Sequence, residues 1–515
     1  MIYFVQGRDH MKILKRLALL LAGVMLLASC SEQAQQETPA DSAQPNKAME
    51  AVEILLTDQA VTVDGEAIGS DATAAVHAAN DIVYYESDRD FTYGEGTAED
   101  AHTAGQAAEH TVVHINQAGT YRVSGKLSKG QIAVDLGENA SQDPKAVVTL
   151  ILDGVDLTCE VAPAVIFYNV YECGNTENPT KDVDTANAGA QVILVDGTQN
   201  TVRGSYVARI YKPDTVVLNQ EGTAVEDAKK LHKYDGAFYS KMSMTIGGEA
   251  KNDGQLALYA ENEGLDSEMH LTINGGIINI ASGNDGINTN EDGVSVTTIN
   301  GGQLTIQVTG ETGEGDGIDS NGWLVINGGT VTAWACSDSA DAGIDSDMGI
   351  HINGGTVMAS GHMLDHIEQG GQTYGVFTFA QKQNGAQTVC LRDQSGKDIM
   401  NGCPPNTYSV LIYSSPALQA GEYTLWSGEQ QLAGQAGGSF GNMGMQPPEG
   451  MQPPEGMQPP EGMQPPEGMQ PPEGMQPPNG NHRPNGQTNG TQDVSVVFSM
   501  VQGGNQFSGI SLATQ

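Results

Sequence analysis

LTINGGIINI at residues 271–280 is the stretch that decides the fold, because close copies of it recur along the chain. The copies are TTINGGQLTI at 297–306, LVINGGTVTA at 324–333 and IHINGGTVMA at 350–359. Apolar residues alternate with polar ones on both sides of each Asn-Gly-Gly turn, which is the pattern of short β-strands. The sequence therefore predicts a strand, a turn and a second strand in every copy.

A second marker precedes each of these turns. It reads Gly264-Leu-Asp-Ser, Gly286-Ile-Asn-Thr, Gly317-Ile-Asp-Ser and Gly343-Ile-Asp-Ser. A single repeat made only of short strands and turns cannot bury its own apolar side, whereas stacked repeats bury a continuous core. A propeller blade would need about 40 residues and other marks. We predict an all-β fold in the form of a parallel β-helix, with the repeated asparagines stacked into a ladder.

The remaining sequence divides the 515-residue chain into further parts. The predicted parts are a lipoprotein signal peptide at 1–30, a polar tether at 31–50, an N-terminal β region with the first β-helix coils at 51–230, the acidic repeat β-helix at 231–365, a small antiparallel β module at 374–430 plus 491–515, and a linker of Met-Gln-Pro-Pro-Glu-Gly repeats at 441–490. Residues 221–233 are expected to form a short helix, with Glu226 and Lys230 four residues apart.

The N-terminus carries an export signal. A basic Met11-Lys-Ile-Leu-Lys-Arg precedes a short apolar run from Leu17 to Leu27, which is the order of a signal peptide. Leu27-Ala-Ser-Cys30 then resembles a bacterial lipobox, in which the cysteine becomes the lipidated first residue. We expect lipidation of Cys30 and a location on the extracellular face of the bacterial cell membrane, with the lipid as the sole membrane contact. The alternative is an ordinary signal peptide with a chance cysteine.

Composition excludes some partners. The formal net charge is -40, from 23 Lys and Arg against 63 Asp and Glu. Such a chain repels nucleic acid and anionic lipid, so we expect neither as a partner. Glycine is frequent at 65 residues and aromatic residues make up only 5%, which suits turn-rich β structure better than helix bundles.

Negative charge is concentrated in residues 252–381, which contain 18 Asp and Glu and no Lys or Arg. The markers place Asp319 and Asp345 at the same turn of successive coils, about 4.8 Å apart. Two carboxylates at that spacing repel by roughly 3 kcal/mol at an effective dielectric of about 20. Either their pKa values rise or a hard cation lies between them, and calcium suits such sites because it takes six to eight oxygens. The candidate calcium ligands are Asp266, Asp316, Asp319, Asp341, Asp345 and Asp347.

Other readings of the polar residues are weaker. A solvated acidic edge with ordinary Asx turns is the alternative to calcium. His362 and His366 are four residues apart, as in some zinc sites, but no third ligand is evident. No catalytic pair of carboxylates is singled out either. Two disulfides in an exported chain, Cys159–Cys173 and Cys390–Cys403, would leave Cys336 buried on a strand.

The motifs together resemble a known family. They are Ala118-Gly-Thr-Tyr-Arg-Val-Ser-Gly-Lys-Leu-Ser-Lys-Gly-Gln-Ile, Leu152-Asp-Gly-Val-Asp-Leu-Thr, Asp235-Gly-Ala-Phe-Tyr-Ser-Lys and the two repeated markers. In this order, over about residues 105–365, they are similar to bacterial, largely clostridial, cell-surface carbohydrate-binding proteins. The resemblance implies a right-handed parallel β-helix like that of pectate lyases, which binds cellulose and acidic, pectin-type sugars with bound calcium. It supports calcium at Asp266, Asp319 and Asp345, whereas Asn288 departs from the acidic pattern.

The expected function is calcium-dependent binding of polysaccharide by a monomeric cell-surface lipoprotein, not catalysis. The first alternative is a polysaccharide lyase or hydrolase on the same fold. Pectate lyases use an arginine as base, and residues 252–381 hold none, so a lyase would need Arg203 or Arg209 from elsewhere. The second alternative is a structural surface adhesin.

Overall fold

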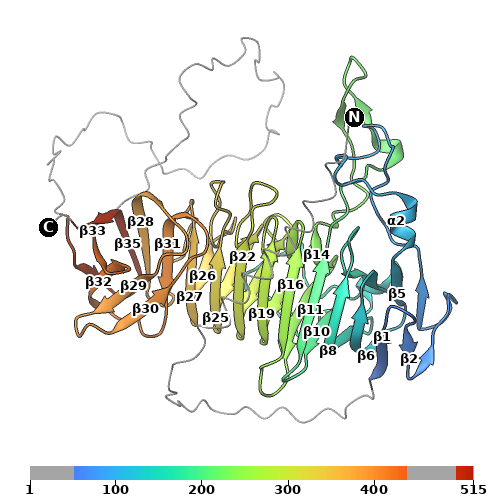
Figure 1. Ribbon diagram of the computed structural model, residues 1–515, viewed down its shortest axis with the longest axis horizontal. Coiled ribbons are helices and arrows are strands. Elements are labelled where there is room, and N and C mark those ends of the chain that lie inside the picture. The colour runs from blue at the N-terminus through green and yellow to red at the C-terminus, as the bar shows by residue number, and fades with distance from the viewer. Residues whose placement is uncertain (1–50, 438–493, 514–515) are drawn as a thin grey trace, which may run out of the picture. The chain divides into compact units, whose positions relative to one another are not determined.

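The computed structural model describes residues 51–437 and 494–513 (Figure 1). As predicted, this part is nearly all β, and its one α-helix, α2 (Ala104–Ala108), has five residues. No helix within it is long and apolar enough to cross a membrane. The predicted signal peptide with Cys30, the tether at 31–50 and the linker at 441–490 lie outside the described residues.

The repeats form two sheets whose strands come from successive repeat units. The strand before each turn is β15 (Met244–Gly248), β18 (Leu271–Ile273), β21 (Val296–Ile299), β24 (Trp323–Ile326) or β26 (Ile350–Ile352). The strand after each turn is β16 (Gln255–Ala260), β19 (Ile277–Ser282), β22 (Gln303–Val308), β25 (Thr330–Trp334) or β27 (Thr356–Gly361). The marker residues form β14 (Gly236–Ser240), β17 (Glu263–Ser267), β20 (Ile287–Thr289) and β23 (Ile318–Ser320) in the other sheet.

Equivalent strands pair in parallel from one unit to the next. Ile273 is opposite Ile299, which is opposite Ile326, and all three are at most 1% exposed. Identical positions therefore stack along the same line through every unit. The apolar positions bury a continuous core, as expected for repeats that cannot bury their apolar side alone.

The predicted asparagine ladder is present at the turns. Asn300 Nδ2 donates to Asn274 Oδ1, Asn327 Nδ2 to Asn300 Oδ1, and Asn353 Nδ2 to Asn327 Oδ1, each at 2.9 Å. The second glycine of each turn has positive φ, as at Gly276 with 88°, which explains the repeated glycine because other residues rarely adopt this conformation.

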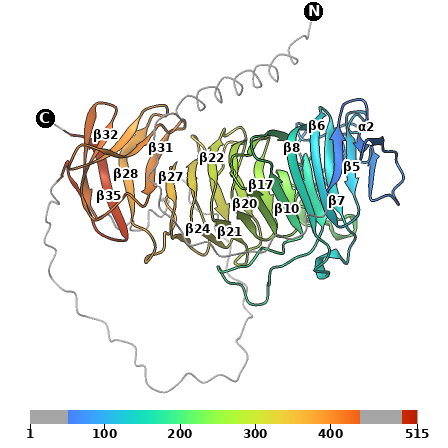
Figure 2. The same ribbon diagram turned by 90° about the horizontal axis from the view of Figure 1, so that it is seen from below.

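Parallel pairing begins before the recognisable repeats. In the large sheet β1 (Val52–Leu56), β6 (Gly119–Leu127), β8 (Val148–Thr158) and β10 (Ala190–Leu194) lead to β15, and β11 (Gln199–Gly204) joins β8 to β16. The smaller sheet continues from β14 through β9 (Val165–Asn169), β7 (Gly130–Asp135) and β5 (Thr111–Ile115) to β4 (Val76–Ala79), which alone is antiparallel there. Figure 2 shows β17 and β20 of this sheet.

The helix predicted over 221–233 is wrong. The segment instead belongs to a hairpin in which β12 (Val217–Leu218) pairs with β13 (Val225–Asp227). Gly222 turns the chain with a φ of 67°. One i,i+4 ion pair stabilises a helix by only about 0.2–0.5 kcal/mol, which is too little to outweigh this turn and the strand pairing.

The C-terminal module continues the large sheet. Its strands are β28 (Tyr374–Gln383), β29 (Val389–Asp393), β30 (Asp398–Gly402), β31 (Tyr408–Ser414), β32 (Gly421–Ser427), β33 (Gln430–Ala436), β34 (Phe498–Met500) and β35 (Gly504–Leu512). β31 pairs antiparallel with β27 of the last repeat unit and with β28. β35 pairs parallel with β28, so the module is mixed and the expectation of a purely antiparallel module needs this correction.

Neither predicted disulfide is formed, since the five described cysteines are free. Cys390 is buried on β29 opposite Asn401, whereas Cys403 is exposed beyond the end of β30. Their side chains therefore lie in different environments. Cys159 is fully enclosed, and burial raises the pKa of its thiol to about 12. Cys336 is buried, as expected, but it lies two residues beyond the end of β25 and not on a strand.

Candidate functional site

The marker strands align acidic residues across the smaller sheet. Asp266 on β17 is opposite Asn288 on β20, which is opposite Asp319 on β23. The Asp345 N–H donates to the Ile318 carbonyl at 2.7 Å, which places Asp345 beside Asp319 in the next repeat unit. We call six residues the acidic row. They are Glu263, Asp266, Asp285, Asp316, Asp319 and Asp345.

Local sequence explains why these side chains leave the core. The isoleucine before Asp319 and the one before Asp345 are fully buried, and successive strand residues point to opposite faces. The glycine before each isoleucine is required because the backbone of the next repeat unit leaves no room for a side chain. A Cβ at Gly317 would lie 2.3 Å from the Gly343 carbonyl oxygen.

The acidic row is buried at the Glu263 end, whereas Asp285, Asp316, Asp319 and Asp345 are half-buried. Asp266 is 0% and Glu263 6% exposed. The Asp285 carboxylate accepts the Asp316 N–H at 2.7 Å, and the Asp316 carboxylate accepts the Ala342 N–H. These carboxylates therefore hold the turns of the next repeat unit as well as facing one another.

Three oxygen atoms of this region are buried without a hydrogen-bond donor among the described residues. They are Glu263 Oε2, Asp266 Oδ2 and Asn288 Oδ1, on the adjacent strands β17 and β20. Asn288 Nδ2 donates to Glu263 Oε1 at 3.1 Å, and Asn290 Nδ2 donates to Asp266 Oδ1 at 2.7 Å. Buried polar atoms normally have a partner because desolvation is costly. No basic side chain of the described residues forms an ion pair with Glu263 or Asp266, and a bound cation would supply the missing partner.

Burial and mutual repulsion raise the pKa of every member of the acidic row. Burial, then neighbouring Asp235, raises the pKa of Glu263 to about 8. Burial, then Asp285, raises that of Asp316 to about 9. Burial, then Asp347, raises the pKa of Asp319 to about 6. Burial, then Asp365, raises the pKa of Asp345 to about 7. The pKa values of Asp266 and Asp285 lie well above the usual range, mainly because of burial.

The structure brings three of the six predicted ligands near one another. Asp345 and Asp319 raise the pKa of Asp316, and Asp319 raises that of Asp345, so these three lie within electrostatic range. Asp347 is exposed, and its N–H donates to the Ser320 carbonyl at 3.0 Å. The Asp341 carboxylate accepts the Gly315 N–H and the Ser339 hydroxyl. Asp266 lies further along the row, next to Glu263.

Sequence reasoning missed Glu263, Asp285 and the oxygen of Asn288. The signal was available, because an acidic residue stands directly before the marker glycine at Glu263-Gly264, Asp285-Gly286 and Asp316-Gly317. The departure of Asn288 from the acidic pattern does not remove an oxygen ligand. Its amide oxygen is buried without a donor among the described residues, and its amide nitrogen contacts Glu263.

A complete set of side-chain ligands is not pre-assembled. Within 51–437 and 494–513, no three His, Cys, Asp or Glu side chains converge as a metal site. Calcium accepts amide and backbone carbonyl oxygens as well as carboxylates, in flexible geometry. The two histidines do not converge either. His362 Nδ1 lies 3.1 Å from Ser409 Oγ, whereas His366 is exposed beside Glu368.

Basic residues approach one end of the row from outside the repeats. The base of the hairpin pairs two segments, with the Lys212 N–H donating to the Lys229 carbonyl at 2.8 Å. We call its cationic residues the basic stem. They are Arg209, Lys212, Lys229, Lys230 and Lys233. Arg209 Nη2 lies 3.2 Å from Asp235 Oδ2, and Lys233 lowers the pKa of Glu268 against a larger effect of burial.

Comparison with known proteins gives one family and one structure. A family model described as "Carbohydrate-binding domain-containing protein" matches residues 109–372. A solved structure titled as the polysaccharide lyase-like protein from C. thermocellum, a gadolinium derivative, is similar at 19% identity and a TM-score of 0.34. That similarity covers 59% of this chain and 89% of the other. No curated protein matches the sequence.

Proposed function

This chain belongs to the carbohydrate-binding domain-containing protein family, and from that premise we propose that it is a calcium-dependent binding protein for anionic polysaccharide. The buried oxygens of Glu263, Asp266 and Asn288 that have no donor carry this proposal. They are hard ligands of the kind that calcium prefers. A bound cation would give these oxygens a partner and would reduce the repulsion between the carboxylates of the acidic row.

We further propose that the parallel repeat units form a right-handed β-helix. The parallel pairing of β18, β21, β24 and β26 supports it. Such a fold keeps equivalent positions in line, so a carboxylate that recurs once per unit becomes a row. Two calcium positions are proposed along the row. The first involves Glu263 and Asp266 of the row with Asn288, and the second draws on Asp316, Asp319 and Asp345 of the row with Asp341 and Asp347.

The basic stem supports an anionic ligand. Lys212, Lys229 and Lys233 are exposed, and none of them has an ion pair in the part of the chain that the structure describes. In a chain with a net charge of -40, exposed lysines without ion pairs attract sugar carboxylates, and Lys233 lies within electrostatic range of Asp235 and Glu268. Calcium would bridge protein carboxylates to uronates, and the lysines would hold neighbouring uronates.

The proposed location follows from the N-terminal sequence. A lipid on Cys30 would hold the protein on the extracellular face of the bacterial cell membrane, where it meets polysaccharide. Incorporation of labelled palmitate, lost in Cys30→Ala, tests this anchor. Label retained by the alanine variant would contradict it.

A polysaccharide lyase is the second candidate, because the structure places Arg209 next to Asp235, beside the acidic row. Residues 252–381 supply no arginine, so Arg209 would have to act as the base that a pectate lyase mechanism requires. Binding is favoured over catalysis because Arg209 is engaged by the Asp235 carboxylate, and an ion-paired guanidinium is a poor base.

Retention on immobilised polygalacturonate and on cellulose, with calcium or with chelator, tests the proposal. Residues 31–515 are applied, and the supernatant is assayed for unsaturated sugar. Calcium-dependent retention on polygalacturonate without product supports binding. Unsaturated product that disappears in Arg209→Lys supports the lyase, and equal retention with and without calcium contradicts the role of the cation.

Glu263→Gln/Asp266→Asn sharpens this test because it removes two carboxylates and keeps their size. It should abolish calcium-dependent retention. Gln394→Ala, at an exposed side chain of the C-terminal module, is the control and should bind as the unaltered chain does.

A further inference from the structure

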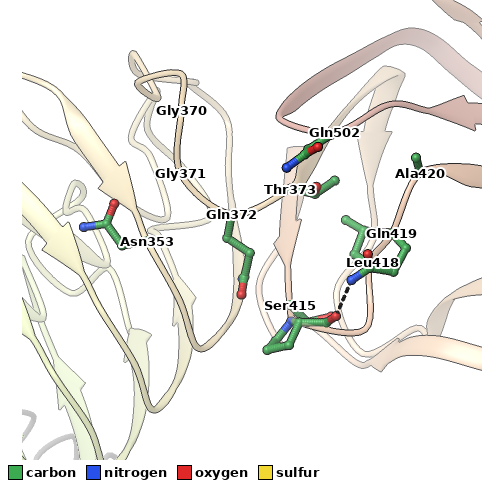
Figure 3. Close-up of a pocket in the computed structure, with 11 residues that line it drawn as sticks. Asn353, Gly370, Gly371, Gln372, Thr373, Ser415, Leu418, Gln419, Ala420 and Gln502 are labelled. Carbon is green, nitrogen blue, oxygen red and sulfur yellow. Dashed lines mark hydrogen bonds between the residues drawn. The ribbon is translucent and has the colours of Figure 1, made fainter.

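A groove lies where the last repeat unit meets the C-terminal module (Figure 3). Its volume is about 610 Å³, within the roughly 300–1,000 Å³ of typical small-ligand sites. Asn353 comes from the turn between β26 and β27, Gln372 from the link to β28, Gln419 from the segment before β32, and Gln502 from the turn before β35. We call it the junction groove.

The lining is neutral, in contrast to the acidic row. Among the described residues, those that line the junction groove include no Asp, Glu, Lys, Arg or His. A buried or half-buried ion needs a counter-charge, which this groove does not offer. Its chemistry comes from side-chain amides, hydroxyls and glycine backbone, so it favours an uncharged ligand rich in hydrogen-bonding groups.

Several of these groups have unused hydrogen-bonding capacity. Asn353 is the last rung of the asparagine ladder. Its Nδ2 donates to Asn327, whereas no described residue donates to its Oδ1. Gln372 Nε2 donates to the Gly355 carbonyl at 2.9 Å and to Ser414 Oγ at 2.8 Å, and its Oε1 has no donor within 51–437 and 494–513. Ser415 Oγ lies 2.9 Å from the Tyr413 hydroxyl, which gives its single hydrogen to the Ile399 carbonyl, so Ser415 is the donor to Tyr413 and keeps only acceptor capacity.

The groove is also rigid across its two sides. The two hydrogen bonds of Gln372 join the last repeat unit, at Gly355, to the module, at Ser414. Antiparallel pairing of β27 with β31 holds the same junction. Preorganised walls lower the entropic cost of binding.

We propose that the junction groove binds a neutral oligosaccharide, without calcium. Sugar hydroxyls both donate and accept, so they match the amide oxygens of Asn353 and Gln372 and the exposed side-chain amide of Gln502. The family match ends at residue 372, and much of the groove wall comes from the module beyond it. The site is therefore separate from the acidic row, and its test is independent of the row.

Affinity should be weak because the lining contains no aromatic side chain on which a sugar could stack. A dissociation constant of about 1 mM corresponds to roughly -4 kcal/mol. A second, weak site on the same protein still strengthens attachment to a long polysaccharide, because the second contact is intramolecular.

Ligand-observed NMR of residues 31–515 with cellohexaose and with mannohexaose tests the proposal. At least one hexasaccharide should show saturation transfer, unchanged by chelator. Gln419→Ala/Gln502→Ala should weaken binding at least fivefold, and Ala420→Trp, which fills the groove, should abolish it. Gln430→Ala, an exposed glutamine of the same module outside the groove, should bind as the unaltered chain does.

Three results would overturn the proposal. They are no binding of either hexasaccharide, binding that survives Ala420→Trp, and binding lost on chelation, which would move the sugar to the acidic row. Saturation of the groove by a Met-Gln-Pro-Pro-Glu-Gly peptide in preference to the sugars would assign it to a protein segment instead. The double alanine variant remains decisive if Ala420→Trp lowers the melting temperature.

Discussion

The asparagine ladder and the acidic row are two stacks with the same spacing and opposite chemistry. In the ladder each amide donates to the amide below it, at 2.9 Å from Asn300 to Asn274. In the acidic row two carboxylate oxygens, Glu263 Oε2 and Asp266 Oδ2, have no donor in the described residues. An amide is both donor and acceptor, whereas a carboxylate only accepts. A fold that repeats a side chain every unit therefore completes an amide stack by itself, but a carboxylate stack needs protons or a cation.

The largest expected effect is stabilisation by calcium. At pH 8 and a calcium concentration 1,000 times the dissociation constant, stability should rise by about 4 kcal/mol. Thermal unfolding with calcium and with chelator measures it. Glu263→Gln/Asp266→Asn should remove most of the difference, and an equal gain in that variant would place the ion elsewhere.

The second effect is loss of stability with rising pH in chelator. Carboxyl pKa values are near 4 in the unfolded chain and are raised in the fold to about 8 for Glu263 and about 9 for Asp316. Groups with raised folded pKa values contribute their full stability below about pH 4 and lose it as pH rises through 6 to 9. Since one pKa unit is about 1.4 kcal/mol, a loss of about 3 kcal/mol or more is expected. Denaturant titrations at pH 5 and pH 9 measure it.

Calcium supplies the control for this pH dependence. Saturating calcium should remove most of the loss at pH 9, because the ion stabilises the ionised row. A stability that rises with pH in chelator would mean that the carboxylates are already stabilised in their charged form. That result would contradict the claim that the acidic row, unlike the asparagine ladder, needs protons or a cation.

Breaking the asparagine ladder should have a smaller effect, without dependence on calcium or pH. Asn327→Ala removes one hydrogen bond to Asn300 and one from Asn353. Each is worth about 1 kcal/mol, so stability should fall by roughly 2 kcal/mol in urea unfolding. Asn178→Ala, at an exposed asparagine outside the ladder, is the control. A loss that changes with calcium would show that the two stacks are not independent.

The smallest effect concerns the basic stem. Lys212→Gln/Lys229→Gln should weaken binding of polygalacturonate about fivefold, close to 1 kcal/mol, and more at low salt than at high salt. Binding of neutral hexasaccharide should not change. Lys397→Gln, in the C-terminal module, serves as the control, and unchanged polygalacturonate binding by the stem variant would exclude the stem from recognition.

Periodicity made the repeat region predictable. The spacing of the Asn-Gly-Gly turns sets the parallel stacking, so the alignment of Asp319 with Asp345 followed from counting residues. Burial did not follow, because the depth of Glu263 depends on segments that pack over the sheet. Arg209 reaches Asp235 from a hairpin whose position no repeat specifies. The junction groove depends on how the C-terminal module pairs with β27. The hairpin and the state of the cysteines could not be predicted either, because no repeated pattern includes them.

Calorimetric titration of calcium at pH 7, in two buffers of different ionisation enthalpy, tests the central claim most directly. Glu263, Asp316 and Asp345 have raised pKa values of about 8, 9 and 7, and ligands must lose their protons to bind metal. The account predicts calcium uptake with release of at least about one proton per protein, both lost in Glu263→Gln/Asp266→Asn. No uptake, or uptake without proton release that persists in the variant, would contradict a calcium site in the acidic row.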